Sequence, residues 1–231
     1  MIELNTIYND DCMIGMKHIK DKSIDMILTD IPYGEVSKNG EDRAKYSGQL
    51  RKLDKGVADE IKFNLDDFLD EVTRISNGGI YIFCGIEQVS KIYTHFSKEK
   101  DFMVRQCAWH KSNPSPMNGQ HMWLSSMENC IFAKRRKTKF NAKTSSSVWK
   151  FPVGRSKIHP TEKPLSLFTY LIESSSDIGD TIFDPCLGSG TTAIACLNTE
   201  RNYIGFELDK DYFDLAKERI SNHKGDKNNI W

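Results

Sequence analysis

The sequence predicts an α/β protein with a mostly parallel, twisted sheet and helices on both faces. Three observations favour this class. Short, β-branched apolar runs alternate with amphipathic stretches along the chain. Two of the apolar runs end in motifs that carry carboxylates or glycines, as strands do where ligands bind at the carboxyl edge of such a sheet. The length of 231 residues suffices for one large α/β domain with a substantial core.

The strands are predicted from short apolar runs that are rich in Val, Ile, Phe and Tyr. They cover residues 25–29, 79–84, 104–110, 129–133, 181–184 and 203–207. Three helices are predicted from apolar side chains that recur with the 3.6-residue period. Two of the stripes consist of Leu65, Phe68, Leu69, Val72 and Ile75, and of Tyr212, Leu215, Ala216 and Ile220. The third opens with Pro164, which suits a first helical position, and carries Leu165, Phe168, Leu171 and Ile172.

The composition, 39% hydrophobic and 28% charged, is typical of a globular protein. The N-terminal residues lack the basic and apolar regions of a signal peptide, and no apolar run approaches the roughly 18 to 20 residues that span a bilayer. None of the 6 cysteines forms a Cys-x-x-Cys pair, which indicates free thiols of a reducing compartment and no metal site. We therefore expect a cytoplasmic protein without a membrane partner.

Positive charge is concentrated in one stretch, although the formal net charge is zero. Between residues 134 and 158 there are nine basic residues and no acidic one. Such a run is often only a solvated face, but a run without compensating carboxylates favours contact with a polyanion. The candidate DNA-binding residues are Lys134, Arg135, Arg136, Lys137, Lys139 and Lys143.

Two segments interrupt the alternation of strands and helices. Residues 34–60 are long, polar and charged, and residues 134–158 are basic and rich in Ser and Thr. Long connections in a compact α/β domain are usually functional or mobile. We expect one domain over residues 1–231, with a mobile ligand-contacting loop at 34–60 and a small recognition insert at 134–158.

A nucleoside cleft is predicted in the C-terminal third, where a strand, a glycine-bearing turn and a helix follow one another over residues 181–195. Gly188 and Gly190 would let the backbone approach a ligand closely. Glu207 lies at the end of the next strand, 23 residues after Asp184, where an acidic residue can bind ribose hydroxyls. The segment matches neither Gly-x-Gly-x-x-Gly nor a phosphate loop, which argues against dinucleotides and nucleoside triphosphates.

The tetrapeptide Asp30-Ile31-Pro32-Tyr33 follows the first long strand and opens on the same edge of the predicted sheet. It combines a carboxylate, a carbonyl held next to a proline of fixed φ, and an aromatic ring. The two acceptors could bind both N–H groups of an exocyclic amine and direct its lone pair at an electrophilic methyl group, while the ring stacks on the base. In isolation such a motif more often has only a structural role, with Asp30 capping a turn and Tyr33 packing in the core.

Taken together, these motifs resemble the DNA N6-adenine and N4-cytosine methyltransferases, in an order that runs through nearly the whole chain. The tetrapeptide resembles the catalytic Asp-Pro-Pro-Tyr of that family, and 159–164 resembles its His-Pro-x-x-Lys-Pro element near the methionine end of the cofactor. Residues 81–85, 109–114 and 128–134 look like its middle strands and base pocket. The cofactor-binding residues that the resemblance implies are Asp11 and Cys12 (after a short strand), His159, Lys163, Asp184, Pro185, Gly188, Gly190, Thr191 and Glu207.

The resemblance implies a Rossmann-like fold that uses S-adenosyl-L-methionine and a circularly permuted motif order, because the tetrapeptide precedes the cofactor glycines. It also implies transfer of a methyl group to a base flipped out of double-stranded DNA. Asp30 favours N6 of adenine, because the N4-cytosine members more often carry Ser at that position. Two departures stand out: Ile31 replaces a proline, which frees an N–H and loosens the backbone, and the recognition insert is short.

Several alternatives stay open from the sequence. They are methylation of cytosine N4, methylation of adenine in RNA, and a catalytically weak subunit that binds nucleic acid. The sequence also leaves open whether the protein forms a homodimer and whether a cognate restriction enzyme accompanies it.

Overall fold

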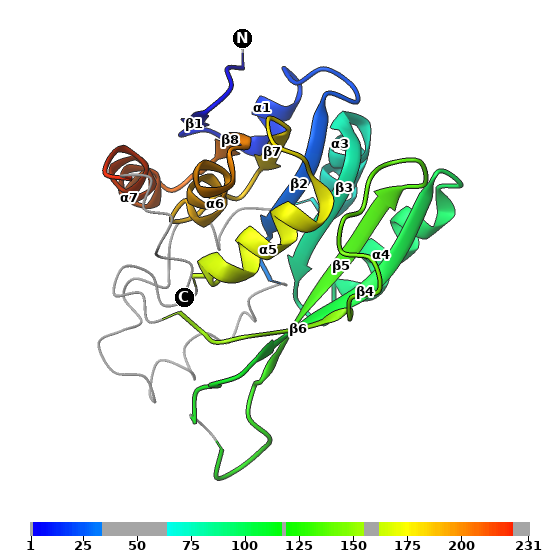
Figure 1. Cartoon of the computed structure of the whole chain (residues 1–231), viewed down its shortest axis with the longest axis vertical. Coiled ribbons are helices and arrows are strands. Elements are labelled where there is room, and N and C mark those ends of the chain that lie inside the picture. The colour runs from blue at the N-terminus through cyan, green and yellow to red at the C-terminus, as the bar shows by residue number, and fades with distance from the viewer. Residues whose placement is uncertain (1, 34–63, 117–118, 155–161, 224–231) are drawn as a thin grey trace.

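The computed structural model describes residues 2–33, 64–116, 119–154 and 162–223. These residues form one eight-stranded sheet with helices packed on both of its faces (Figure 1). The strand order is β1-β8-β7-β2-β3-β5-β4-β6. The predicted α/β class with a mostly parallel sheet is therefore confirmed.

Five neighbouring strands are parallel, so their carboxyl ends meet at one edge, which we call the catalytic edge. They are β1 (Thr6–Tyr8), β8 (Asn202–Phe206), β7 (Thr181–Asp184), β2 (Ile24–Asp30) and β3 (Ser76–Cys84). Next to β3, β5 (Met127–Arg135) runs antiparallel, whereas β4 (Phe102–Lys111) and β6 (Val148–Phe151) again point toward the catalytic edge. Consequently β5 begins at the catalytic edge and ends at the opposite one.

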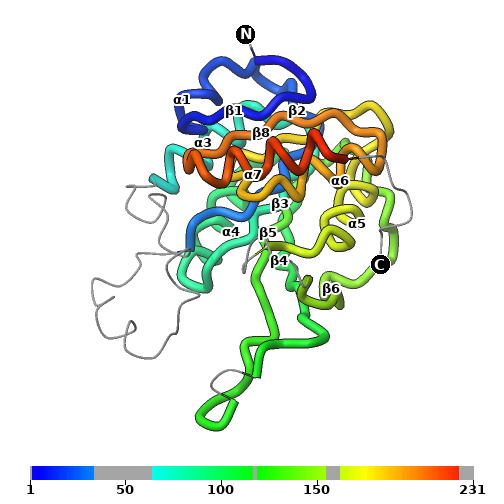
Figure 2. The backbone as a smooth tube through the Cα atoms, turned by 90° about the vertical axis from the view of Figure 1, so that its left-hand side faces the viewer, coloured from blue at the N-terminus to red at the C-terminus, as the bar shows by residue number. Residues whose placement is uncertain are grey.

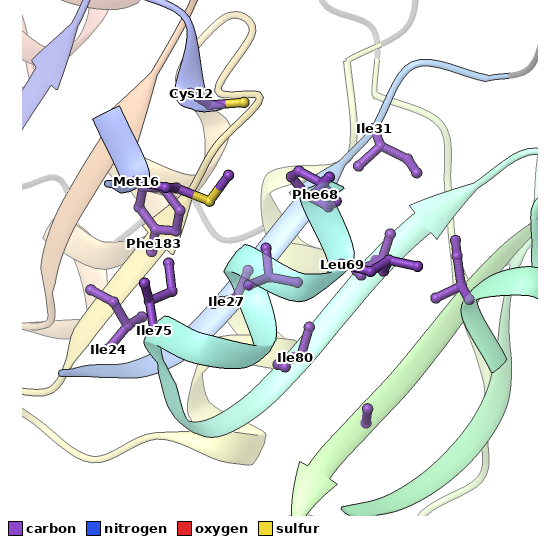
Figure 3. Close-up of a cluster of buried hydrophobic side chains, with 14 of the residues drawn as sticks. Cys12, Met16, Ile24, Ile27, Ile31, Phe68, Leu69, Ile75, Ile80 and Phe183 are labelled. Atoms are coloured by element: carbon purple, nitrogen blue, oxygen red, sulfur yellow. The ribbon is translucent and has the colours of Figure 1, made fainter. Parts of the chain in front are cut away.

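Alternate side chains of the central strands pack into two cores, one on each face of the sheet. Ile27 of β2 belongs to the first core and its neighbours Met26 and Leu28 belong to the second. The first core is covered by α1 (Cys12–Met16), α3 (Leu65–Ile75) and α4 (Val89–Lys98) (Figure 3). The second is covered by α5 (Leu165–Ser175), α6 (Thr191–Thr199) and α7 (Lys210–Ser221).

Helix α3 illustrates why the periodicity located the elements. Its five buried residues are the five of the predicted stripe, Leu65, Phe68, Leu69, Val72 and Ile75. The side chain of Asn64 caps its start by accepting hydrogen bonds from two first-turn N–H groups. The six predicted strands are also present, with ends that differ by at most three residues.

Some elements differ from the prediction. Pro164 is the N-cap of α5 and not its first helical residue, because its ψ of 131° is extended. Helix α4 and strand β6 carried no predicted counterpart. The predicted loop at 34–60, the end of the basic stretch at 155–158 and His159 lie outside the described residues. Among the helices in the described ranges, none combines the length and apolar character needed to cross a membrane.

Candidate active site

The tetrapeptide begins at the last residue of β2, in the middle of the catalytic edge. The N–H of Ile31, which a proline would lack, donates to the Phe83 carbonyl of β3 at 3.2 Å. The Ile31 side chain is buried in the first core, on the same side of the sheet as Phe68 and Leu69 of α3 (Figure 3). The sheet and the core thus supply the constraint that the missing proline would have supplied, contrary to the looser backbone expected from the sequence.

The next residue, Pro32, is held through its carbonyl by a glutamine that the sequence did not single out. Gln88 Nε2 donates to the Pro32 oxygen at 2.9 Å, and Gln88 Oε1 accepts from the N–H of Gly85 at the same distance. Gly85 follows β3, so one amide side chain ties the tetrapeptide to the neighbouring strand end. Within the described part of the chain no group donates to the Ile31 carbonyl, which leaves this acceptor available to a ligand.

Four ionisable side chains meet at the tetrapeptide. The Tyr33 hydroxyl donates to Asp30 Oδ1 at 2.7 Å and lies 3.2 Å from Glu128 Oε2. The Lys163 ammonium forms an ion pair with Asp30, lies 3.0 Å from Glu128 Oε2 and 3.2 Å from the Tyr33 oxygen. The Tyr33 side chain remains 40% exposed, so a base could still reach its ring.

Glu128 reaches this cluster because β5 is antiparallel and starts at the catalytic edge. Its neighbour Asn129 lies opposite Cys84, the last residue of β3. The other oxygen of Glu128, Oε1, lies 2.7 Å from the Lys111 ammonium at the end of β4. One carboxylate therefore joins two lysines. The sequence pattern does not reveal the direction of β5, so it could not predict that Glu128 and Lys111 meet at the tetrapeptide.

The charges in the cluster support one another. Burial works against the charge on Lys163, but the Asp30 and Glu128 carboxylates outweigh it and raise the pKa of Lys163 above its ordinary value. Burial also opposes the charge on Glu128, yet Lys163 and Lys111 lower its pKa. The pKa of Tyr33 is strongly raised by burial and by the two carboxylates, so its hydroxyl stays protonated and acts as a donor.

Lys163 was expected near a cofactor carboxylate. Its ammonium contacts the carboxylates of Asp30 and Glu128, which places it within the tetrapeptide cluster. Its burial, with 6% of the side chain exposed, means that these partners are needed for it to be charged at all.

The predicted cleft at β7 and β8 lies at the same edge. Asp184 ends β7 and is buried, and its carboxylate accepts from Thr192 Oγ1 at 2.5 Å and from the Cys186 N–H at 3.1 Å. Burial, only partly offset by the Thr192 hydrogen bond, raises the pKa of Asp184 to about 7. Pro185 follows in the buried turn that leads to the glycines.

Both predicted glycines adopt backbone conformations that favour glycine. Gly188 has φ of +56° and Gly190 has φ of +84°. A Cβ at Gly190 would lie 3.2 Å from the Ala216 Cβ, so this glycine lets α6 begin close to α7. A Cβ at Gly188 would meet nothing within 4 Å, so open space adjoins this turn.

Glu207 comes directly after β8 and faces the Gly188 turn. Its two carboxylate oxygens accept from the N–H groups of Gly188 at 2.7 Å and Asp209 at 2.9 Å. Burial raises the pKa of Glu207, although those two hydrogen bonds oppose the shift. Each oxygen keeps a second lone pair that could accept from a sugar hydroxyl. The buried carboxylate beside an open, glycine-lined turn fits the ribose of a nucleoside cofactor.

The remaining predicted cofactor residues border this turn. Thr191 donates from its hydroxyl to Glu162 Oε1 at 2.8 Å, and Glu162 forms an ion pair with Arg219 of α7. Asp11 caps α1 by accepting from the Met13 N–H at 2.8 Å. Cys12, the first residue of α1, is buried and belongs to the first core.

The first residues of the basic stretch, which were predicted to bind DNA, lie at the opposite edge of the sheet from the tetrapeptide. In β5, Cys130 lies opposite Phe83 near the catalytic edge. Lys134, four residues further along β5, lies opposite Gly79 near the start of β3. Lys134 is buried and its ammonium donates to the carbonyls of Arg135 and Thr138 at 2.9 and 2.8 Å. These contacts hold the fold together and do not face a DNA strand at the tetrapeptide.

Neighbouring basic residues are also engaged by partners from other segments. Arg135 pairs with Asp101 at 2.7 Å, Arg136 Nε donates to the Lys100 carbonyl at 2.9 Å, and Lys139 pairs with Asp177 at 2.6 Å. Lys137 and Lys143 are exposed. The chain then returns toward the catalytic edge in β6, where exposed Lys150 lies opposite His110. A charge count along the sequence could not see these partners.

The comparisons with known proteins agree with this geometry. A family model described as DNA methylase matches residues 24–218. The type II methyltransferase M.HinfI of Haemophilus influenzae is 31% identical over 259 aligned residues, which cover 98% of this chain and 71% of that protein. The solved M1.HpyAVI–SAM complex has a TM-score of 0.69 and 30% identity, and the match covers 93% of this chain and 98% of that one.

A third similar protein, the cytosine-N4-specific PvuII DNA methyltransferase, superimposes with a TM-score of 0.72 at 16% identity, over 98% of this chain and 90% of that one. At this identity the likeness shows a shared fold alone. The resemblance drawn from the order of the motifs is confirmed, and the chain belongs to the family of DNA N6-adenine and N4-cytosine methyltransferases.

Proposed function

We propose that this DNA methyltransferase transfers a methyl group from S-adenosylmethionine to N6 of adenine in double-stranded DNA. The observation that carries the choice of adenine is the Asp30 carboxylate at the carboxyl end of β2, since N4-cytosine members of the family more often carry Ser there. The solved structure of M1.HpyAVI is a complex with SAM, which supports this methyl donor.

The tetrapeptide can make a poor nucleophile reactive. The lone pair of an exocyclic amine is delocalised into the ring, so the amine must be oriented before it attacks. Asp30 and the carbonyl of Ile31 would accept hydrogen bonds from its two N–H groups, and the Asp30 carboxylate would take up the proton that the amine loses on methylation. Lys163 holds the Asp30 carboxylate in place through their ion pair.

The base must leave the duplex before it can reach these groups, at a cost of a few kcal/mol. Stacking on the exposed ring of Tyr33 would return about 1 to 3 kcal/mol of that cost. The hydroxyl of Tyr33, held by Asp30 and Glu128, fixes where the ring can lie. Tyr33 thus acts as a platform whose position depends on the charged cluster.

The cleft at β7 and β8 would hold the cofactor. Glu207 is proposed to bind the ribose hydroxyls, with Asp184, the Gly188 turn and Thr191 beside it, while Asp11 and Cys12 border the adenine. His159, outside the described residues, is proposed on resemblance alone. When bound, S-adenosylmethionine supplies an electrophilic methyl group on its sulfonium.

The proposal is tested by tritium transfer from labelled S-adenosylmethionine to duplex DNA. Asp30→Ala and Tyr33→Ala should abolish labelling while cofactor binding, measured by calorimetry, persists; Asp214→Ala on the exposed face of α7 is the matched control. Mass spectrometry of the product nucleosides should find N6-methyladenine. N4-methylcytosine would overturn the choice of base, and preference for structured RNA over duplex DNA in a competition assay would overturn the choice of polymer.

The family relatives also bear on the biological setting. M.HinfI is named a type II methyltransferase, and we propose that this chain likewise modifies one short sequence as the partner of a restriction enzyme. Modification-sensitive sequencing of DNA from an expressing host should reveal a single methylated motif. Methylation scattered without a motif would contradict this role.

A further inference from the structure

Between β4 and β5, residues 112–116 and 119–126 project from the catalytic edge, away from the body of the protein (Figures 1 and 2); we call these described residues the hairpin. Its base is well anchored. The Lys111 N–H donates to the Ser126 carbonyl at 2.8 Å, and Asn113 Oδ1 accepts from the Val153 N–H at 2.6 Å. The hairpin is thus an extension of the sheet that starts beside the tetrapeptide cluster.

The distal part of this hairpin exposes a group of large apolar side chains. Met122 is 68% exposed, Trp123 is 97% exposed and Leu124 is 40% exposed. A tryptophan that is almost wholly in water contributes little packing to its own fold, and clustered exposed apolar residues mark interaction sites. We call Met122, Trp123 and Leu124 the apolar tip.

The apolar tip lies within reach of the reacting base. Glu128, whose carboxylate contacts the Tyr33 hydroxyl at 3.2 Å, is five residues from Trp123. Five fully extended residues span at most about 18 Å, so Trp123 lies within that distance of Glu128 along the chain. This reach is comparable with the width of a DNA major groove, which is about 12 Å. The tip can therefore contact the same stretch of duplex that presents its base to Tyr33.

The charge around the apolar tip suits DNA better than another protein surface. The hairpin contains no acidic residue between Lys111 and Glu128. Exposed Lys150 lies on β6, the strand next to β4, whereas Lys111 at the base of the hairpin is paired with Glu128. Apolar and aromatic side chains flanked by cations are the combination with which proteins insert wedges into a duplex.

We propose that the apolar tip enters the duplex beside the target base, with Trp123 stacking in the space that the flipped base vacates. The proposal deepens the function given above, since it requires a flipped base but not a particular one. A flipped base leaves an unstacked gap, and an aromatic side chain in that gap stabilises the open state because every base presents a face for stacking.

The test uses the full chain and a duplex carrying the recognition sequence read from methylated host DNA. Trp123→Ala should weaken binding and slow methylation by about 10-fold to 100-fold, the range given by loss of one base–aromatic stack. Trp123→Phe should recover most of this. The matched control is Ile178→Ala, which removes a 69% exposed apolar side chain near the start of β7, at the opposite edge, and should change nothing.

A second substrate separates a wedge from a general binding contact. When the target base is placed in a mismatch, it flips at lower cost, so the defect of Trp123→Ala should shrink several-fold. An equal defect on paired and mismatched DNA, or none on either, would overturn the proposal. A Trp123→Ala variant that changes the sedimentation coefficient would assign the tip to a second copy of the chain and also overturn it.

The two proposals fail in different ways. A wild-type protein that labels no DNA, or labels cytosine, contradicts the adenine function whatever Trp123 does. If the wild-type protein methylates DNA and Trp123→Ala binds and methylates it equally well, only the wedge is wrong.

Discussion

Glu128 Oε2 lies 3.0 Å from the Lys163 ammonium nitrogen, although the two residues are 35 positions apart and neither belongs to the tetrapeptide. The same carboxylate contacts Lys111 and Tyr33, so it connects two lysines with the tyrosine whose hydroxyl donates to Asp30. Glu128 acts on the reaction through Lys163 and Tyr33, and we regard it as a positioning residue.

Glu128→Gln should lower kcat by at least about tenfold, the loss expected for one charge-assisted hydrogen bond. The glutamine keeps the shape of the side chain but removes one of the two carboxylates that raise the pKa of Lys163. That pKa should therefore fall, and the alkaline limb of the kcat profile should move to lower pH. Stopped assays across the pH range measure both effects.

The matched control for Glu128→Gln is Glu99→Gln, an exposed glutamate that follows α4. It should leave kcat and the pH profile unchanged. A purely structural role for Glu128 would lower activity without moving the alkaline limb, and such a result would contradict the positioning role.

Lys163→Met should destabilise the fold by about 3 kcal/mol at neutral pH, because it removes the cation from the half-buried Asp30 carboxylate and leaves Glu128 with Lys111 alone. The loss should depend on pH. The raised pKa of Lys163 gives stabilisation that is present below its ordinary value of 10.5 and is lost as pH rises through the folded value. The lowered pKa of Glu128 gives stabilisation that is present above 4.5 and is lost as pH falls through the folded value.

Urea unfolding of wild-type and Lys163→Met proteins at several pH values measures this difference. The difference in the free energy of unfolding between the two proteins should be constant between about pH 5 and 10 and should shrink at lower and at higher pH. Lys210→Met, which breaks an exposed ion pair with Asp214 on α7, is the control and should cost less than about 1 kcal/mol. A difference for Lys163→Met that is independent of pH would contradict the charge-based account.

Asp184→Asn should remove a loss of stability that the wild-type protein undergoes as pH rises. Burial raises the pKa of Asp184 from 3.8 to about 7, so the folded protein holds a proton that the unfolded chain has released. As pH rises from 3.8 to 7, the free energy of unfolding of the wild-type protein should therefore fall relative to that of the variant. The fall should reach up to about 4 kcal/mol, at 1.36 kcal/mol per pH unit.

Thermal and urea unfolding of the two proteins between pH 4 and 8 gives this slope. Asparagine keeps only one of the two oxygens that accept from Thr192 and from the Cys186 N–H, so the variant should be less stable at every pH. The test is therefore the change of the stability difference with pH, and not its absolute size. Asp214→Asn on the exposed face of α7 should show no such slope. Parallel curves for wild type and Asp184→Asn would contradict the raised pKa.

Local sequence patterns predicted most of the fold because the periods of helix and strand depend only on near neighbours. The stripe of α3 and the bounds of β7 agree with the structure to the residue. Helix α4 escaped detection because only Ile92 and Phe96 of its ten residues are buried, which leaves a weak pattern. Strand β6 is four residues long and lies at the edge of the sheet.

The candidate site was predictable only where one motif carries it. The tetrapeptide and the glycine turn are contiguous, so their order along the chain revealed them. Glu128 and Gln88 come from other strand ends, and their roles depend on the direction of β5 and on the turn after β3. The effect of Ile31 was misjudged for the same reason, since its N–H is satisfied by Phe83 on a different strand.

Arg135→Ala tests whether the start of the basic stretch binds DNA, because Arg135 was predicted to bind DNA and its side chain closes the end of α3. Its guanidinium donates to the carbonyls of Thr73 and Ser76 at 3.0 Å, pairs with Asp101 at 2.7 Å and lies 4.7 Å from the Phe102 ring centroid. Removing it should lower the free energy of unfolding by about 2 to 4 kcal/mol, since several charge-assisted hydrogen bonds are lost.

The same variant should bind DNA with unchanged affinity and salt dependence at temperatures where it remains folded. Lys150→Ala, at an exposed position on β6 near the catalytic edge, should behave in the opposite way. It should leave stability within about 0.5 kcal/mol of wild type and reduce the slope of log K against log salt by about 1, because one phosphate contact is lost. If Arg135→Ala reduced that slope and Lys150→Ala did not, DNA would lie against the opposite edge of the sheet, and the placement of the duplex at the tetrapeptide would be wrong.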